Sequence, residues 1–376
     1  MPVRLYHWPR LKATLAIMKT QVMHHTIWEN VASTMNNSAA LTKKKTINRR
    51  EMHNMMEIVK VTDLTKRYGN VEAVRGISFS IQQGEIFGFL GPNGAGKTST
   101  INMLTGLARP TSGRIIIDGM DAIKDIKKVQ SIIGIVPDDN NLYDEMDGFE
   151  NMCFCAALYG MRKSERERRA RELLKQFNLV SAGKRPFKTY SKGMKRKLTI
   201  AAGIIHNPKI LFLDEPTTGI DVESARQIRQ LILDLKKQGT TIFITTHYIE
   251  EAERICDRIA FIVNGKIVKT GTVEQLMQHA QDEHIIELKL SRDIKNLKTK
   301  IEDNFKNCRV EVPGENSCLL ISKEPIKLSP VLQFLDAKGV SVYEAKAIKP
   351  TLEDVFVKVT GIQAAELKKD EVKKQK

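Results

Sequence analysis

The chain has 376 residues, 41% of them hydrophobic, with a mean hydropathy of -0.29 and a formal net charge of +16. Its longest nearly apolar run, Leu198–Ile205, is far shorter than the ~20 residues of a membrane-spanning helix, so the sequence predicts no such helix. The length suffices for two domains with buried cores. The positive charge favours contact with an acidic surface, either nucleic acid or the anionic face of a membrane.

The first 54 residues stand apart from the rest of the chain. They carry nine Lys or Arg and two Glu, and their apolar residues follow no period. We expect residues 1–54 to be disordered and foreign to the native fold, as an extension upstream of a start at Met55 or Met56. A mitochondrial transit peptide is the weaker alternative, suggested by the acid-poor composition.

Two strands are expected before the first motif. Ile58–Val61 is one, and Ile77–Ile81, whose apolar residues alternate with polar ones, is a strand with one buried face. Tyr68 is expected in the loop between them, where a purine base could stack on its ring. The alternative for Tyr68 is ordinary packing on the edge of the sheet.

The stretch from Gly91 to Thr98 matches the phosphate-binding pattern G-x-x-x-x-G-K-[ST] at every fixed position. It follows an expected buried strand, Ile86–Leu90, and precedes an expected helix, Thr98–Leu107, which is the context that the motif needs. Lys97 would reach the β and γ phosphates, and Thr98 would offer its hydroxyl to Mg²⁺. The residues expected to hold the nucleotide here are Gly91, Pro92, Asn93, Gly94, Ala95, Gly96, Lys97, Thr98 and Ser99.

Further strands follow at Arg114–Asp118 and Ile132–Val136, and the stretch Met146–Leu179 is expected to be largely helical. Basic residues in this stretch, from Arg162 to Arg171, are interleaved with Glu. We expect a solvated face with ion pairs rather than a nucleic-acid groove, because no aromatic residues lie among the charges.

A continuous apolar run, Ile210–Leu213, ends in the acidic pair Asp214 and Glu215. Such a run is typical of a buried parallel strand with acids at its carboxyl end. Side chains of adjacent strand residues point to opposite faces, so Asp214 can face a metal while Glu215 faces an attacking water. A helix, Asp221–Lys237, and a second buried strand, Thr241–Thr246, complete a β-α-β unit. His247 follows directly, although a histidine alone at that place is weak evidence.

These motifs together resemble the nucleotide-binding subunit of an ATP-binding cassette (ABC) transporter over residues 56–280. The resemblance implies that Glu215 orients the attacking water, that His247 is the switch histidine, and that Thr98 and Asp214 hold Mg²⁺. Asp221 closes the loop Thr217–Asp221 that crosses to a second copy.

Two motifs depart from the family pattern. The signature, usually LSGGQ, is YSKGM here, from Tyr190 to Met194, and it retains Ser191 and Gly193, the positions that bind the γ-phosphate in the family. Where the family commonly has Gln, this chain has Asp138. The shorter, charged side chain could still reach the metal through a water.

The remainder, residues 281–361, is expected to form a small α/β accessory domain, followed by a Lys-rich tail over 362–376. Its end, from Thr351 to Phe356 and at Thr360-Gly361, resembles the C-terminus of export-type subunits that pair with a separate membrane protein. The strands expected here are Ile285–Leu288, Arg309–Val312, Leu319–Ser322 and Val340–Ala345, with helices near Asp293–Phe305 and Leu328–Ala337.

The resemblance implies an α/β P-loop NTPase of the ABC ATPase type, with a mixed-sheet core and a helical subdomain over residues 55–280. It implies ATP and Mg²⁺ as ligands, a second ATPase subunit, a polytopic permease and a place at the cytoplasmic face of the membrane, with no nucleic acid. The alternative is a soluble ABC ATPase that acts on nucleic acid or the ribosome. The five cysteines show no disulfide framework, and we expect them to be reduced, including Cys308 and Cys318, which could meet across a hairpin.

Overall fold

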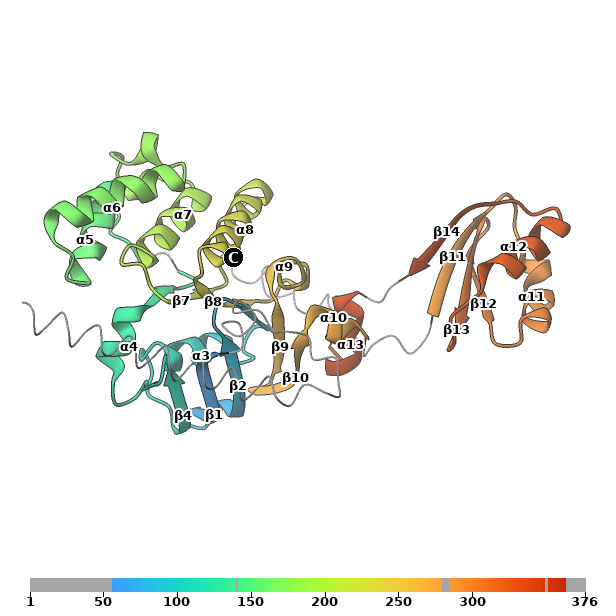
Figure 1. Cartoon of the computed structure of the whole chain (residues 1–376), viewed down its shortest axis with the longest axis horizontal. Helices are drawn as coiled ribbons and strands as arrows, with labels where there is room; N and C mark the ends of the chain where they lie inside the picture. The colour runs from blue at the N-terminus through green and yellow to red at the C-terminus, as the bar shows by residue number, and fades with distance from the viewer. Residues whose placement is uncertain (1–55, 140, 279–283, 349–350, 363–376) are drawn as a thin grey trace, which may run out of the picture. The chain divides into compact units, whose positions relative to one another are not determined.

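The computed structural model describes residues 56–139, 141–278, 284–348 and 351–362 (Figure 1). The expected N-terminal extension and the tail beyond residue 362 lie outside the described residues. We refer to residues 56–278 together with the last helix as the main domain, and to residues 284–348 as the C-terminal domain.

A six-stranded sheet in the order β10-β9-β3-β8-β7-β6 forms the centre of the main domain. Five strands are parallel to their neighbours, and only the edge strand β10 pairs antiparallel, with β9. Because the parallel strands share a direction, their carboxyl ends meet at one edge, and the expected motifs follow them there. The strands are β3 (Ile86–Leu90), β6 (Ile133–Val136), β7 (Ile210–Asp214), β8 (Thr241–Thr246), β9 (Arg258–Val263) and β10 (Lys266–Thr272).

A second, antiparallel sheet packs against one face of the central sheet, with strand order β2-β1-β4-β5. Phenylalanines fill the interface, and the Phe79 and Phe87 rings stack at 5.6 Å between centroids. Tyr68 is the last residue of β1 and pairs with Val71, so the turn begins one residue later than expected. The strands are β1 (Glu57–Tyr68), β2 (Val71–Gln82), β4 (Ser112–Ile117) and β5 (Met120–Asp121).

Helices cover the other face and form a separate helical group in which α5, α6 and α7 contact one another (Figure 1). The stretch expected to be one largely helical segment is two helices, α5 and α6, with Gly160 at positive φ between them. The helices of the main domain before the C-terminal domain are α3 (Lys97–Leu104), α4 (Ile126–Ile132), α5 (Gly148–Leu158), α6 (Lys163–Gln176), α7 (Lys192–Gly203), α8 (Val222–Lys237), α9 (Ile249–Ile255) and α10 (Val273–Gln278).

The charged face expected on α6 is present: Arg168 and Arg171 each pair with a Glu four residues away on the exposed surface. No helix in the described ranges is long and apolar enough to cross a bilayer. The five cysteines are free thiols, and burial raises the pKa of Cys155 and of Cys318 to about 11, which makes both thiols poor nucleophiles.

The C-terminal domain has the order β-α-β-β-α-β and one antiparallel sheet, β12-β13-β11-β14, which is the ferredoxin-like arrangement. Its two helices and one sheet face enclose a core of their own around Leu288, Leu320 and Leu335. The elements are β11 (His284–Leu290), α11 (Lys298–Asn304), β12 (Arg309–Gly314), β13 (Ser317–Ser322), α12 (Leu328–Ala337) and β14 (Val342–Ile348).

The last helix, α13 (Leu352–Thr360), packs on the main domain and not on this sheet. Its buried residues Leu352, Val355 and Phe356 belong to the same core as the central sheet. The Phe356 ring meets that of Phe261 in β9 edge to face at 5.2 Å. The C-terminal domain is therefore inserted between α10 and α13, so the expected unit 281–361 contains one helix of the neighbouring core.

Phe356→Ala should lower the free energy of unfolding by about 3–5 kcal/mol, because it empties a fully buried aromatic site in the core that holds β9. Urea unfolding of the full chain, followed by circular dichroism, measures the change. Tyr343→Ala in the C-terminal domain, where the ring is 75% exposed, is the matched control and should cost about 0.5 kcal/mol or less. Equal effects of the two changes would contradict the packing of α13 on the main domain.

Candidate functional site

The phosphate-binding loop joins the central strand β3 to α3, as the motif predicts. Two of its glycines are required by close backbone approaches: a Cβ on Gly91 would lie 2.1 Å from the carbonyl oxygen of Ile262, and one on Gly96 would lie 2.5 Å from that of Ala73. Gly96 also has φ +102, which L side chains rarely adopt. The loop therefore brings bare backbone N–H groups and the N-terminus of α3 to one point, where anions bind.

Lys97 is buried, with 5% of its surface exposed, and its ammonium group lies inside the loop. The Nζ atom donates hydrogen bonds to the carbonyl oxygens of Gly91, at 2.8 Å, and Pro92, at 3.1 Å. It also lies 3.0 Å from the Oε1 atom of Glu215. The positive charge predicted to meet phosphate is thus already in contact with the acidic strand end.

Asp214, the last residue of β7, is buried beside the loop. It accepts hydrogen bonds from the hydroxyls of Thr245 and Thr98. Burial raises the pKa of Asp214, and these two hydrogen bonds work against that rise. Thr98 is exposed, and its hydroxyl bonds to the carboxylate of Asp214. The two residues expected to hold Mg²⁺ are therefore in contact.

Glu215 lies between two basic groups. Its Oε2 atom is 2.7 Å from Nδ1 of His247, while Oε1 faces Lys97. Burial raises the pKa of Glu215, but the hydrogen bond with His247 and the charge of Lys97 outweigh it and lower the pKa to about 2. The carboxylate is therefore ionised at neutral pH. Glu215 also has φ +48, a backbone conformation that the surrounding structure must stabilise.

Two further side chains position this cluster and were not identified from the sequence. Thr245 in β8 contacts the backbone N–H of Glu215 through its hydroxyl, at 3.1 Å, and also bonds Asp214. Glu251 in α9 is buried, and its Oε1 atom accepts a hydrogen bond from Thr217 at 2.7 Å. Burial raises the pKa of Glu251. Thr245 lies near the end of β8 and Glu251 in the helix that follows it, but their residue types form no motif that sequence reasoning could use.

The signature segment begins α7. Ser191 is the N-cap of that helix, and its hydroxyl accepts a hydrogen bond from the backbone N–H of Met194 at 3.3 Å. Gly193 is buried, and a Cβ there would lie 2.2 Å from Oγ of Ser224 in α8. Asp221 caps α8 through a 2.8 Å hydrogen bond from the Ser224 N–H. The two helix N-termini that carry Ser191 and Asp221 are therefore in close contact.

The remaining predicted residues lie in different surroundings. Asp138 follows β6, and Arg196 of α7 contacts its backbone and its carboxylate. Tyr68 is 47% exposed, and Nζ of Lys66 lies 4.6 Å from its ring centroid, so one face of the ring carries a cation. Ser99, Asn93 and Gly94 are at least partly exposed in the loop or the first turn of α3.

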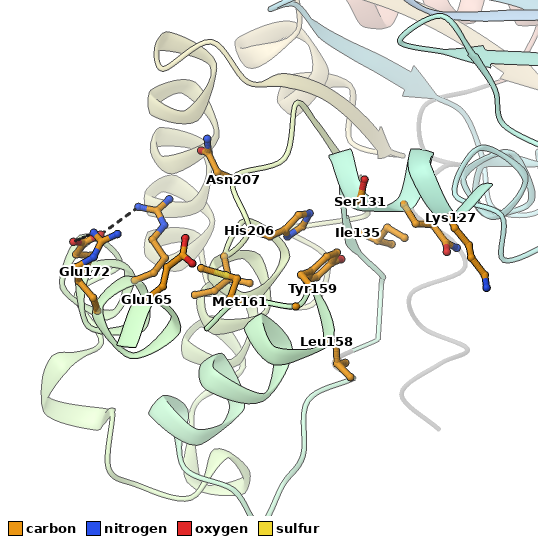
Figure 2. Close-up of a pocket in the computed structure, with 15 residues that line it drawn as sticks. Lys127, Ser131, Ile135, Leu158, Tyr159, Met161, Glu165, Glu172, His206 and Asn207 are labelled. Atoms are coloured by element: carbon orange, nitrogen blue, oxygen red, sulfur yellow. Dashed lines mark hydrogen bonds and ion pairs between the residues drawn. The ribbon is translucent and has the colours of Figure 1, made fainter. Parts of the chain in front are cut away.

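A groove of 1050 Å³ lies between α4, the end of α5, α6 and the segment after α7 (Figure 2). The Tyr159 and His206 rings stack at 3.5 Å on its wall, and the Nε2 atom of His206 is 2.9 Å from the carbonyl oxygen of Ile133. Burial lowers the pKa of His206. Leu158 is 71% exposed, and Glu165 and Glu172 lie on the opposite side of the groove (Figure 2).

Comparison with known proteins places these features in a family. A family model described as ABC transporter matches residues 74–218. The chain is 40% identical over 234 residues to the linearmycin resistance ATP-binding protein LnrL of Bacillus subtilis, covering 62% of this chain and 75% of that protein. It is 40% identical over 248 residues to the doxorubicin resistance ATP-binding protein DrrA of Mycobacterium tuberculosis, covering 65% and 74%. ABC transporter A family member 7 of Arabidopsis thaliana is 36% identical, but only 31% of its length is covered.

Solved structures agree with the fold. The ATP-binding subunit of an ABC transporter matches with a TM-score of 0.55 and 29% identity, over 59% of this chain and 92% of that one. A dimeric ATP-binding cassette in a post-hydrolysis state, with bound ADP and Pi, matches with a TM-score of 0.53 and 27% identity, over 57% and 98%. The P-loop NTPase fold predicted from the sequence is confirmed, and the chain belongs to the ABC transporter family as one of its ATP-binding subunits.

Proposed function

We propose that this chain hydrolyses ATP to power an ABC-2-type membrane exporter, at the cytoplasmic face of the cell membrane. The observation that carries the proposal is the buried cluster of Lys97, Glu215 and His247 at the carboxyl ends of the parallel strands. Family membership supports ATP hydrolysis in general. Two relatives are named for resistance to linearmycin and to doxorubicin, and export of a toxic compound is one way to give resistance. The sequence of α13, which resembles that of export-type subunits, also supports export.

Lys97 and the loop amides would bind the phosphates of ATP. The β and γ phosphates carry more negative charge than one carboxylate, so they would compete with Glu215 for the ammonium group of Lys97. Transfer of Lys97 to phosphate removes one of the interactions that lower the pKa of Glu215. The carboxylate would then have a stronger affinity for a proton in the nucleotide complex.

Glu215 and His247 would hold the attacking water in line with the γ-phosphate. Phosphoryl transfer needs positioning and charge stabilisation more than a strong base, so the carboxylate would serve mainly to orient the water. The hydrogen bond between Nδ1 of His247 and Glu215 fixes the orientation of the imidazole ring, so that its other edge can meet phosphate.

The donor set fits Mg²⁺, which is usually bound through one or two protein oxygens together with phosphates and waters. Thr98 and Asp214 supply these oxygens, and no group of three or more His, Cys, Asp or Glu able to hold a metal occurs within the described ranges. When bound, Mg²⁺ would neutralise charge on the phosphates.

A second copy of this chain, or a close homologue, would complete the site. Ser191 and Gly193 at the N-terminus of α7 would contact the γ-phosphate held by the other subunit. The similarity to a dimeric cassette supports this arrangement. ATP would thus join the two subunits, and hydrolysis would release them.

The groove in Figure 2 would receive the separate polytopic permease. Several apolar or aromatic side chains line it together, among them Leu158, Tyr159 and Met161, and exposed apolar groups gathered in one place mark interaction sites. The arginines and glutamates of α6 would form the polar border of the interface, as is usual around an apolar centre.

Glu215→Gln should lower ATP turnover by about 100-fold or more while ATP still binds, because Gln keeps the shape but cannot carry the charge. Phosphate release and nucleotide titration of the full chain give the two values. Lys97→Ala, as a contrast, should weaken nucleotide binding itself. Turnover of the Gln variant at the normal rate would remove Glu215 from this role.

Thr245→Val should destabilise the fold by about 1–3 kcal/mol, because the buried Asp214 loses a hydrogen bond. It should also raise the Mg²⁺ concentration needed for half-maximal turnover, since the pKa of Asp214 rises further. Thr245→Ser, which retains the hydroxyl, is the matched control. The interpretation of Asp214 as a metal-holding group fails if Val and Ser show the same Mg²⁺ dependence.

Leu158→Asp should abolish co-purification with the permease without changing ATP affinity, because it places a charge on the apolar rim of the groove. Val180→Asp is the control: Val180 is 65% exposed in the 3₁₀ turn after α6 and does not line the groove. Equal losses in both variants would contradict docking in this groove. If no permease is recovered with the wild type and RNA binds with a steep salt dependence, the alternative function on nucleic acid is favoured.

A further inference from the structure

Arg196 of α7 connects the signature helix to the loop that follows β6. Only 4% of its surface is exposed. Its Nη1 atom donates to the carbonyl oxygen of Pro137 and its Nη2 atom to that of Asp138, both at 2.5 Å. Nη2 also lies 3.7 Å from Oδ1 of Asp138. Both arms of one guanidinium group therefore hold two consecutive peptide units of the same loop.

This contact requires an arginine. The guanidinium fork is planar, and its donors match two acceptors at once, whereas a lysine offers a single compact charge. Burial lowers the pKa of Arg196, and the carboxylates of Asp138 and Asp214 oppose that effect. A buried cation is tolerated only where such hydrogen bonds and charges compensate its lost hydration, so this arginine has little freedom to leave the loop.

The loop held by Arg196 connects to both proposed sites, the permease groove and the signature segment at Ser191. Asp138 comes two residues after the end of β6, and Ile135 within β6 lines the permease groove. At the other end, α7 begins five residues before Arg196 at the cap Ser191, which is the residue expected to contact nucleotide on the second copy. The same helix, α7, therefore begins at the signature residue Ser191 and carries Arg196, the residue that holds the loop.

We propose that Arg196 is a positioning residue that transmits movement of the signature helix to the Pro137–Asp138 loop and from there to the permease groove. In this role Asp138 is the counter-ion of Arg196 and not a metal ligand. The inference rests on the proposed function, because it requires that Ser191 engages nucleotide and that the groove binds a permease. It adds a mechanical connection through a residue that belongs neither to the phosphate-binding loop nor to the signature segment.

Arg196→Lys in the full chain, assembled with its permease in membranes, tests the link. We expect the ATP affinity and the basal turnover of the subunit alone to stay within about threefold of wild type, and the permease-stimulated turnover to fall at least tenfold. Hydrogen exchange of the amides of Asp138 and Asp139 should be faster, because Pro137 itself has no amide hydrogen. Lys195→Ala is the control on the same helix. The Lys195 ammonium group lies 3.4 Å from Asp144 and 4.9 Å from the Phe187 ring centroid, and neither partner belongs to the Pro137–Asp138 loop.

Two results would overturn the proposal. The first is normal permease-stimulated turnover in Arg196→Lys. The second is an equal fall of basal and stimulated turnover together with a lower melting temperature, because that pattern indicates a structural role only. The wild type provides a test that does not depend on folding of the variant. Addition of ATP should change exchange at the start of α7 and at residues 138–139 together, and a change confined to α7 contradicts the link. Absence of any ATP turnover in the wild type would instead defeat the proposed function. Faster exchange at residues 138–139 in nucleotide-free Arg196→Lys would still establish that Arg196 holds the loop.

Discussion

The ionised carboxylate of Glu215, buried between Lys97 and His247, is the interaction on which the rest of the structure depends. A buried charge without partners costs several kcal/mol, so the fold must bring a cation and an imidazole to the same point. It does this by ending three neighbouring parallel strands, β3, β7 and β8, at one edge of the central sheet. Each strand contributes one group from the residues that follow it, and none of the three groups could be buried in isolation.

The central sheet is rigid because both of its faces are buried. Phenylalanines on one face pack against the antiparallel sheet, and aliphatic side chains on the other pack against helices. Strand ends fixed in this way hold side chains within the small tolerances that phosphoryl transfer requires. The return of α13 to the second face extends that core, so the C-terminal domain is tied to the main domain by chain segments at both of its ends.

The sequence predicted the parts of the site in which a residue type and a spacing carry the chemistry: the loop from Gly91 and the acids after Ile210–Leu213. His247 was identified only through the resemblance to the family, because a single histidine after a strand is weak evidence by itself. The sequence could not predict Arg196 or Glu251, because a buried charged side chain is recognised only when its partners from distant elements are known. The β9-β10 hairpin was missed although its signal was present. Asn264-Gly265, both at positive φ, lies between two apolar runs and is the strongest short hairpin signal.

One departure from the family signature, Tyr190 at its first position, is accommodated by residues of two other segments. Tyr190 replaces the usual Leu, and its hydroxyl, which burial would leave unsatisfied, donates a 2.7 Å hydrogen bond to the carbonyl oxygen of Ala182. The space for that ring exists because residue 148 is a glycine: a Cβ on Gly148 would lie 2.2 Å from the Tyr190 hydroxyl. Gly148 thus leaves room for the Tyr190 ring, and the carbonyl oxygen of Ala182 satisfies its hydroxyl. The signature helix can therefore keep its place, and Ser191 its cap position, while the first residue of the motif differs from the family pattern.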